Sequence, residues 1–264
     1  MEGQETISPF MPMFEQFRTE LDEHHDRRER ITKASRDITA ASKKIIFTLQ
    51  RVRTLNQPLT QQTVKANKQY YEAISGHYSA ISKDLQGLNA WRYNRQITGG
   101  CQEWMEAACF QHYLETASLI SHEDAAQKLK DLDPDGPGVQ LSPEDWVLGV
   151  YDMTGELMRF AITAMATSGE LPVIPSSSSG DAMDVDSSKQ RNLLTDMRGL
   201  RAALESLDTG VGPFAKDARN KMEVMQTSVE KVEKALYGLI VRGAERPKGW
   251  MPEVESGRPV EVEG

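Results

Sequence analysis

The chain contains little cysteine and no long apolar run. Among its 264 residues the only cysteines are Cys101 and Cys109, eight positions apart on one expected helix. That separation is too long for a disulfide. Two unpaired cysteines fit a protein of a reducing compartment. The Cys and His spacing of a zinc site is also absent. No stretch approaches the roughly 18 apolar residues of a membrane-spanning helix, and no charged-then-apolar leader opens the chain. We therefore expect an intracellular protein that does not insert into membranes.

Sequence motifs of several enzyme classes are also missing. There is no Gly-rich phosphate loop, no Ser-His-Asp ordering and no sequence context for a catalytic cysteine. The Glu-x-x-His motif of ferritin-like di-iron bundles is absent, and no segment shows the period-two alternation of a β-strand. With 39% hydrophobic and 27% charged residues, the composition is that of an ordinary soluble protein. These absences favour an all-α protein.

Helical periodicity runs through most of the chain. From Pro9 to about Leu55 apolar residues recur close to every 3.5 positions, which predicts one helix of about 45 residues. We expect an all-α bundle of about seven helices with this very long helix first, the others lying near 60–88, 92–120, 121–132, 146–167, 190–207 and 214–241. Residues 9–243 would form one helical domain containing a flexible acidic linker at 171–189, between a disordered stretch at 1–8 and a tail at 244–264.

Charge is unevenly distributed along the sequence. The net charge of −8 argues against a nucleic-acid binder held by global charge. Between Arg27 and Arg53, however, nine Lys or Arg residues face only two acids, Glu29 and Asp37. This stretch is either a surface that faces an anionic ligand or the solvated face of a long helix.

Carboxylates on two apolar helices are the main candidates for chemistry. The segment 146–167 is apolar nearly all round, yet a narrow polar stripe along it includes Asp152 and Glu156. Glu103 and Glu106 share one face of the earlier helix, again among apolar residues. If the helices pack together, four carboxylates converge, and an unpaired buried charge would be costly. The carboxylates are then neutralised either by nearby arginines or by a hard metal ion such as magnesium or manganese.

Several separate blocks, in order, resemble the translin family. They are Arg36–Thr39, Arg95–Glu103 with Glu106 and Ala107, Phe110–Tyr113, Gly149–Arg159, Lys231–Glu233 and Val241–Gly243. The resemblance extends from about residue 8 to residue 252. Translin shares the fold and the ending, but the catalytic member keeps acids at the positions of Glu103, Glu106 and Asp152. A short loop at 133–141 and the linker near 180 depart from the family pattern without touching these acids.

The resemblance implies a function. It implies the catalytic subunit of the complex that promotes RNA-induced silencing, a Mg²⁺-dependent endoribonuclease assembled with translin into a roughly octameric shell. The substrate would be single-stranded RNA or RNA fragments, from silencing passenger strands or precursor transfer RNA, in the cytoplasm and nucleus. Glu103, Glu106 and Asp152 would bind Mg²⁺ or Mn²⁺, and Glu156, one turn after Asp152, would be a further ligand or a base.

Basic residues near these acids are candidates for RNA binding. Arg92 and Arg95 precede the Glu pair on the same expected helix, and Lys43 and Lys44 lie in the basic stretch. The alternative is that the arginines neutralise the acids, and Arg159 is expected to pair with Glu156 at i,i+3. Two other functions stay open: a non-catalytic RNA-binding or scaffold subunit, and an all-α nucleotide pyrophosphohydrolase.

Overall fold

The computed structural model describes residues 9–174 and 191–242. It contains eight α-helices and one 3₁₀ helix within these ranges: α1 (Met11–Leu49), α2 (Gln61–Ile81), η1 (Ser82–Leu85), α3 (Leu88–Arg92), α4 (Asn94–Thr116), α5 (His122–Lys130), α6 (Pro143–Ser168), α7 (Leu193–Glu205) and α8 (Pro213–Arg242). The described residues form no strand beyond one isolated bridge, between Val173 and Asn192. The predicted all-α fold with a very long first helix is confirmed. The expected disordered residues 1–8, most of the linker and the tail lie outside the described residues.

Contacts divide the chain into two compact units. The first holds Met1–Val52, Pro58–Tyr113 and Ser118–Val150, which includes α1 to α5 and the beginning of α6. The second holds Arg53–Gln57, Leu114–Ala117 and Tyr151–Gly264, which includes the rest of α6 with α7 and α8. No described helix combines the length and hydropathy needed to cross a membrane.

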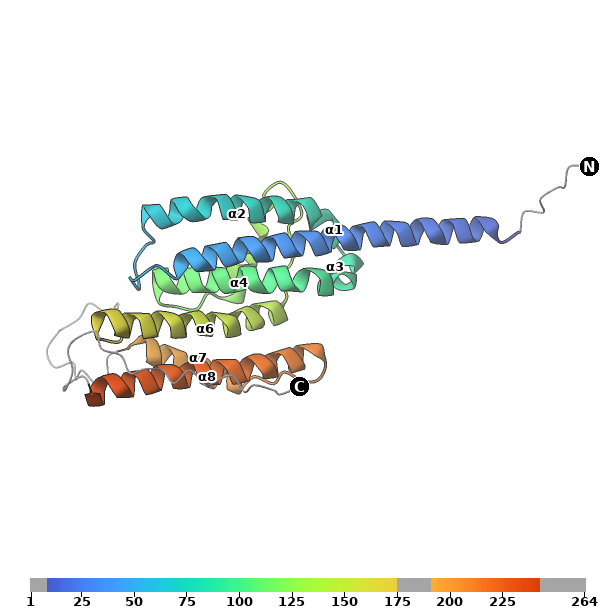
Figure 1. Ribbon diagram of the computed structural model, residues 1–264. Coiled ribbons are helices and arrows are strands. Elements are labelled where there is room, and N and C mark those ends of the chain that lie inside the picture. The colour runs from blue at the N-terminus through green and yellow to red at the C-terminus, as the bar shows by residue number, and fades with distance from the viewer. Residues whose placement is uncertain (1–8, 175–190, 243–264) are drawn as a thin grey trace, which may run out of the picture. The chain divides into compact units, whose positions relative to one another are not determined.

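In the first unit α1 packs beside α2 and α4 (Figure 1). The buried face of α1 includes Ile31, Ile38 and Ile45, spaced at seven residues as the periodicity predicted. α1 approaches α4 closely because Gly100 has no side chain: a Cβ there would lie 3.1 Å from the Cα and carbonyl oxygen of Ser35. The Ser35 hydroxyl accepts a 3.0 Å hydrogen bond from the Gly100 N–H. This approach places the second half of α1 alongside the acidic part of α4.

The second unit packs α8 against α7 and the later part of α6. Its core includes Leu157 and Phe160 of α6, Met197 of α7 and Val229 of α8. Tyr151, at the start of this unit, donates a 3.3 Å hydrogen bond to the carbonyl oxygen of Leu204. The unit therefore holds one face of α6 through both apolar and polar contacts.

Several helix boundaries differ from the prediction: the helix expected at 60–88 ends at Ile81 and is followed by η1, and the helix expected to reach residue 120 ends at Thr116. The first helix ends at Leu49 instead of continuing to about residue 55, and the next residue caps it by donating to the carbonyls of Ile46 and Thr48. The helix expected from residue 92 is preceded by a separate short helix, α3, and begins at Asn94. The break falls at Tyr93, whose side chain is buried and hydrogen-bonded to His24 of α1. A tertiary contact therefore sets this boundary, and periodicity carries no information on it.

Candidate functional site

The first pair of predicted acids lies on α4. Glu103 and Glu106 are both partly exposed, between the buried residues Trp104, Met105 and Ala107. Lys43 of α1 brings its Nζ within 3.7 Å of Glu103 Oε2, and the side chains are 64% and 19% exposed respectively. The predicted RNA-binding residue Lys43 is therefore an ion-pair partner of a predicted metal ligand. Its neighbour Lys44 is exposed.

Glu106 lies near a buried thiol. Burial raises the pKa of Cys109, and the negative charge of Glu106 raises it further. Next to this glutamate, α6 crosses α4 closely within the first unit. A Cβ on Gly149 would lie 2.6 Å from the Cβ of Met105 and 3.2 Å from the backbone nitrogen of Glu106. Only glycine allows that approach, so the crossing point of the two helices is encoded in one residue.

The second pair of acids lies on α6 within the second unit. Asp152 is half-buried and accepts a hydrogen bond from Lys221 of α8. Glu156 is only 8% exposed, and its Oε2 lies 3.5 Å from Nε of Arg159. The predicted pairing of Arg159 with Glu156 is confirmed. Lys221 was not predicted, because its partner lies 69 residues away and no local motif marks it.

The two pairs of acids lie in separate units of the structure. Within residues 9–174 and 191–242 no three His, Cys, Asp or Glu side chains could hold a metal ion together. The pairs belong to different units, and Glu103, Asp152 and Glu156 each have a Lys or Arg partner. The donor chemistry nonetheless fits the ion: carboxylate oxygens are the ligands that Mg²⁺ and Mn²⁺ prefer. The Asp152 side chain is 31% exposed, so an ion could reach it from solvent.

A fifth carboxylate, Asp145, is more deeply buried. It lies in the first turn of α6, where Ser142, the residue before the helix, accepts a 3.1 Å hydrogen bond from its N–H. The Asp145 side chain is 3% exposed and accepts hydrogen bonds from Thr98 and Gln102 of α4. Burial raises the pKa of this carboxyl, which the hydrogen bonds from Thr98, Gln102 and Ser142 partly offset. Asp145 therefore fixes the start of α6 to the turn of α4 that precedes Glu103.

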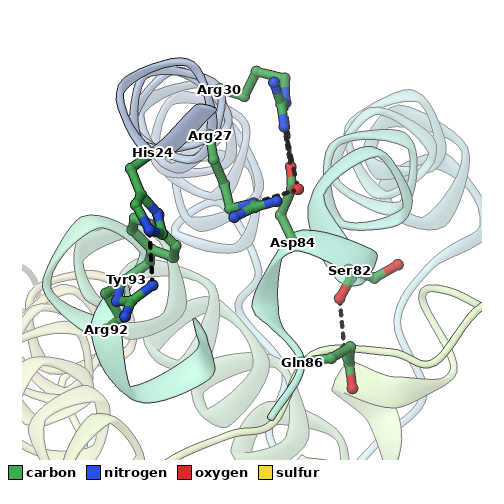
Figure 2. Close-up of polar contacts among 8 residues, drawn as sticks. All are labelled: His24, Arg27, Arg30, Ser82, Asp84, Gln86, Arg92 and Tyr93. Carbon is green, nitrogen blue, oxygen red and sulfur yellow. Dashed lines mark hydrogen bonds and ion pairs between the residues drawn. The ribbon is translucent and has the colours of Figure 1, made fainter. Parts of the chain in front are cut away.

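The two arginines predicted to bind RNA end up in different surroundings. Arg92, at the end of α3, is exposed and donates a 3.1 Å hydrogen bond to Nε2 of His24 (Figure 2). Arg95, in the first turn of α4, is exposed. Arg92 therefore supports the contact of α3 with α1. At Glu103 the structure places the cation of Lys43 within ion-pair distance.

The fold and the paired acids on α4 and α6 define a helical subunit of the translin type. The chain belongs to the translin family: the model of that family matches residues 26–243. It is 32% identical to translin-associated protein X of Rattus norvegicus, over 94% of this chain and 84% of that protein. It is 28% identical to the homolog of that protein in Schizosaccharomyces pombe, over 88% and 89%, and 24% identical to translin of Mus musculus, over 83% and 87%.

Solved structures share the fold. The structure described as AfC3PO aligns with a TM-score of 0.57 at 19% identity, covering 89% of this chain and 98% of that one. The structure described as apo-NeC3PO aligns with the same TM-score at 15% identity, covering 90% and 99%. At these identities the likeness concerns the arrangement of helices, which supports the translin-type bundle derived above.

Proposed function

We propose that this chain is the Mg²⁺-dependent endoribonuclease subunit of a hetero-oligomeric assembly with translin. Glu103, Glu106 and Asp152 hold the ion, with Mn²⁺ as an alternative, and Glu156 is a further ligand or a base. When bound, the ion supplies an activated water and offsets charge on the phosphate undergoing attack. The substrate is single-stranded RNA, such as a silencing passenger strand or a precursor transfer RNA fragment, met in the cytoplasm or nucleus.

One observation carries this proposal: the predicted ligands are acids held on apolar helices with cations beside them. Asp152 and Glu156 lie on a helix whose other faces are buried, and their charges are balanced by Lys221 and Arg159. A divalent ion would balance the same charges while adding Lewis-acid chemistry. Gly149 brings α6 against the backbone of Glu106, and Asp152 follows Gly149 by three residues on that helix.

The chain's own side chains would handle substrate and protons. Lys44 and Arg95 are exposed cations, suited to holding substrate phosphates on either side of the cleaved bond. Once a metal ion binds the Glu103 carboxylate, Lys43 would leave its ion pair with Glu103 and bind a substrate phosphate instead. Glu156, nearly buried beside Arg159, would accept a proton from the attacking water.

Cleavage of a labelled single-stranded RNA by the complex with translin tests the proposal. Glu103→Gln and Asp152→Asn keep side-chain shape while removing ligand charge, so each should lower the cleavage rate at least 100-fold with assembly intact. Glu72→Gln removes an exposed acid of α2 that pairs with Lys68, and it should cleave at the wild-type rate. Chelation of Mg²⁺ should abolish cleavage by the wild type. Wild-type cleavage by either ligand variant would overturn the site assignment.

The second candidate function is a non-catalytic RNA-binding or scaffold subunit. The observation in its favour is the set of ion pairs at Glu103, Asp152 and Glu156, which balances the acids without a metal. In that case the wild-type complex would bind RNA without cutting it, and calorimetric titration with Mg²⁺ would show no binding that depends on Asp152.

A further inference from the structure

The first half of α1 lies outside the helical bundle. The buried residues of this helix begin at Ile31, so its first 20 residues contribute none to the core. We call these residues, together with the N-cap residue Phe10, the N-terminal arm (residues 10–30). At 1.5 Å per residue it is about 30 Å long. Figure 1 shows this blue end of α1 extending beyond α2, α3 and α4 of the same unit.

The N-terminal arm exposes an apolar stripe. Phe10, Phe14, Phe17 and Leu21, the members of this stripe, have exposed fractions of 62%, 61%, 48% and 68%. The stripe continues a heptad pattern, with alternating spacings of four and three, through positions 10, 14, 17, 21, 24, 28, 31, 35, 38, 42, 45 and 49. From position 31 onward every one of these residues is buried. The face of α1 that packs on its own bundle is therefore the face that the arm presents to solvent.

The base of the N-terminal arm is held firmly. Arg27 and Arg30 both reach Asp84 of η1 at 3.0 Å, and Figure 2 shows the two guanidinium groups converging on that carboxylate. Because an arginine can only donate, the bond from Arg92 makes Nε2 of His24 an acceptor. The Nδ1–H of His24 is then the donor to the Tyr93 hydroxyl. These contacts orient the helix at the point where it leaves the bundle, and a pre-oriented helix loses less entropy on binding.

The charges on the N-terminal arm indicate what kind of surface it can bind. From residue 11 to residue 26 there are five acids, Glu15, Glu20, Asp22, Glu23 and Asp26, against Arg18 alone. Two arms side by side would bring acid against acid, and the whole chain carries −8. The fitting surface is an apolar groove between helices with basic side chains along its rims. The heptad spacing also indicates a helical partner, because side chains at this spacing pack into the gaps between side chains of a facing helix.

We propose that the N-terminal arm of α1 docks into an apolar, basic-rimmed helical groove on a translin subunit. The inference rests on the hetero-assembly proposed above and names the surface of this chain that builds it. Three phenylalanines at roughly 150 Å² each, with Leu21 and two methionines, give on the order of 600 Å² from this side. A standard interface buries about 800 Å² per partner, so the arm would supply most of one.

The test uses the full-length chain co-expressed with translin of the same organism. Phe14→Ala/Phe17→Ala removes two members of the stripe and should weaken association at least tenfold, measured by native mass spectrometry across a dilution series. Gln16→Ala/Thr19→Ala changes two exposed residues of the same arm outside the stripe and should assemble like wild type. Because the stripe is exposed, the melting temperature of the isolated chain should be the same for both variants.

A second pair of substitutions tests the charge argument. Glu20→Lys/Glu23→Lys should weaken association at low salt and lose this effect as salt screens the rim. Normal assembly by the Phe14→Ala/Phe17→Ala variant would overturn the inference, as would loss of self-association of this chain with translin binding intact. A wild-type complex that forms but does not cleave RNA would refute the proposed endoribonuclease function without contradicting the docking of the arm. An arm variant that assembles and cleaves normally refutes only the docking.

Discussion

At the scale of single residues, the buried carboxylate of Asp145 shows how this bundle tolerates a charge. It has hydroxyl and amide donors from α4 and a position in the first turn of α6, where the helix dipole favours an anion. These contacts do not cancel the cost of burial, since the pKa stays raised. The folded state therefore binds this proton more tightly than the unfolded chain.

The raised pKa of Asp145 predicts a pH dependence of stability. Between its unfolded pKa of about 3.9 and its raised folded pKa, the folded state holds more protons, so this group's contribution falls as pH rises. Asp145→Asn keeps an acceptor for Thr98 and Gln102 but cannot titrate. Urea unfolding from pH 4 to pH 7 should show the variant gaining stability relative to wild type as pH increases.

The control for that measurement is Glu123→Gln, an exposed acid on α5. Its unfolding free energy should follow the wild-type pH profile. A constant difference between Asp145→Asn and wild type across this range would contradict the assigned titration.

At the scale of elements, the crossing of α6 over α4 depends on one missing side chain. Gly149 touches the buried Met105, and it lies beside the backbone of Glu106. Gly155, six residues later on the same helix, has open space around its position for a Cβ. The two glycines therefore provide matched sites, one required by packing and the other not.

Alanine at these glycines should have opposite effects. Gly149→Ala places a Cβ against Met105 and should cost roughly 2–3 kcal/mol of unfolding free energy, as overpacking does. Gly155→Ala should stabilise by up to about 1 kcal/mol, because alanine favours helix over glycine. Chemical denaturation of both variants checks this, and equal effects from the two would refute the crossing geometry. In the assembly Gly149→Ala should also slow RNA cleavage, since it displaces Glu106.

At the scale of the whole molecule, the chain is acidic overall while the second half of α1 is basic. Lys43 and Lys44 are exposed on that half, together with Lys33 and Arg36. Any RNA affinity of an acidic chain must come from such a local surface, because the net charge repels phosphate. Binding through such a surface weakens as salt increases, and the slope of log affinity against log salt reports how many phosphates the protein neutralises.

Replacing the two adjacent lysines tests this surface in the assembled complex. Lys43→Ala/Lys44→Ala should weaken binding of single-stranded RNA equally across sequences and flatten the plot of log affinity against log salt by about 1.4, at roughly 0.7 per phosphate. Lys65→Ala/Lys68→Ala removes two exposed lysines of α2 and should leave the slope unchanged. An unchanged slope in the first variant would exclude this part of α1 as the RNA surface.

The local features of this protein were determined by its sequence. Helical periodicity predicts the helices, and i,i+3 spacing pairs Arg159 with Glu156. The hydroxyls of Ser121 and Ser142 accept backbone N–H bonds in the first turns of α5 and α6, a contact between near neighbours in the sequence. The family blocks around Glu103 and Asp152 were also legible in the sequence, and family membership is confirmed. All of these depend on neighbours within a few residues or on patterns that the chain carries by itself.

Only the tertiary structure decided which distant groups meet. Lys221 bonds Asp152, which lies 69 residues away in the sequence. Lys43 pairs with Glu103 because Gly100 lets α4 approach α1 at Ser35. The break between α3 and α4 falls at Tyr93, which is hydrogen-bonded to His24. No local pattern encodes such pairs, because they follow from how helix faces pack. Packing also separates the two halves of the heptad face of α1: the second half is buried in its own bundle, and the first half is exposed.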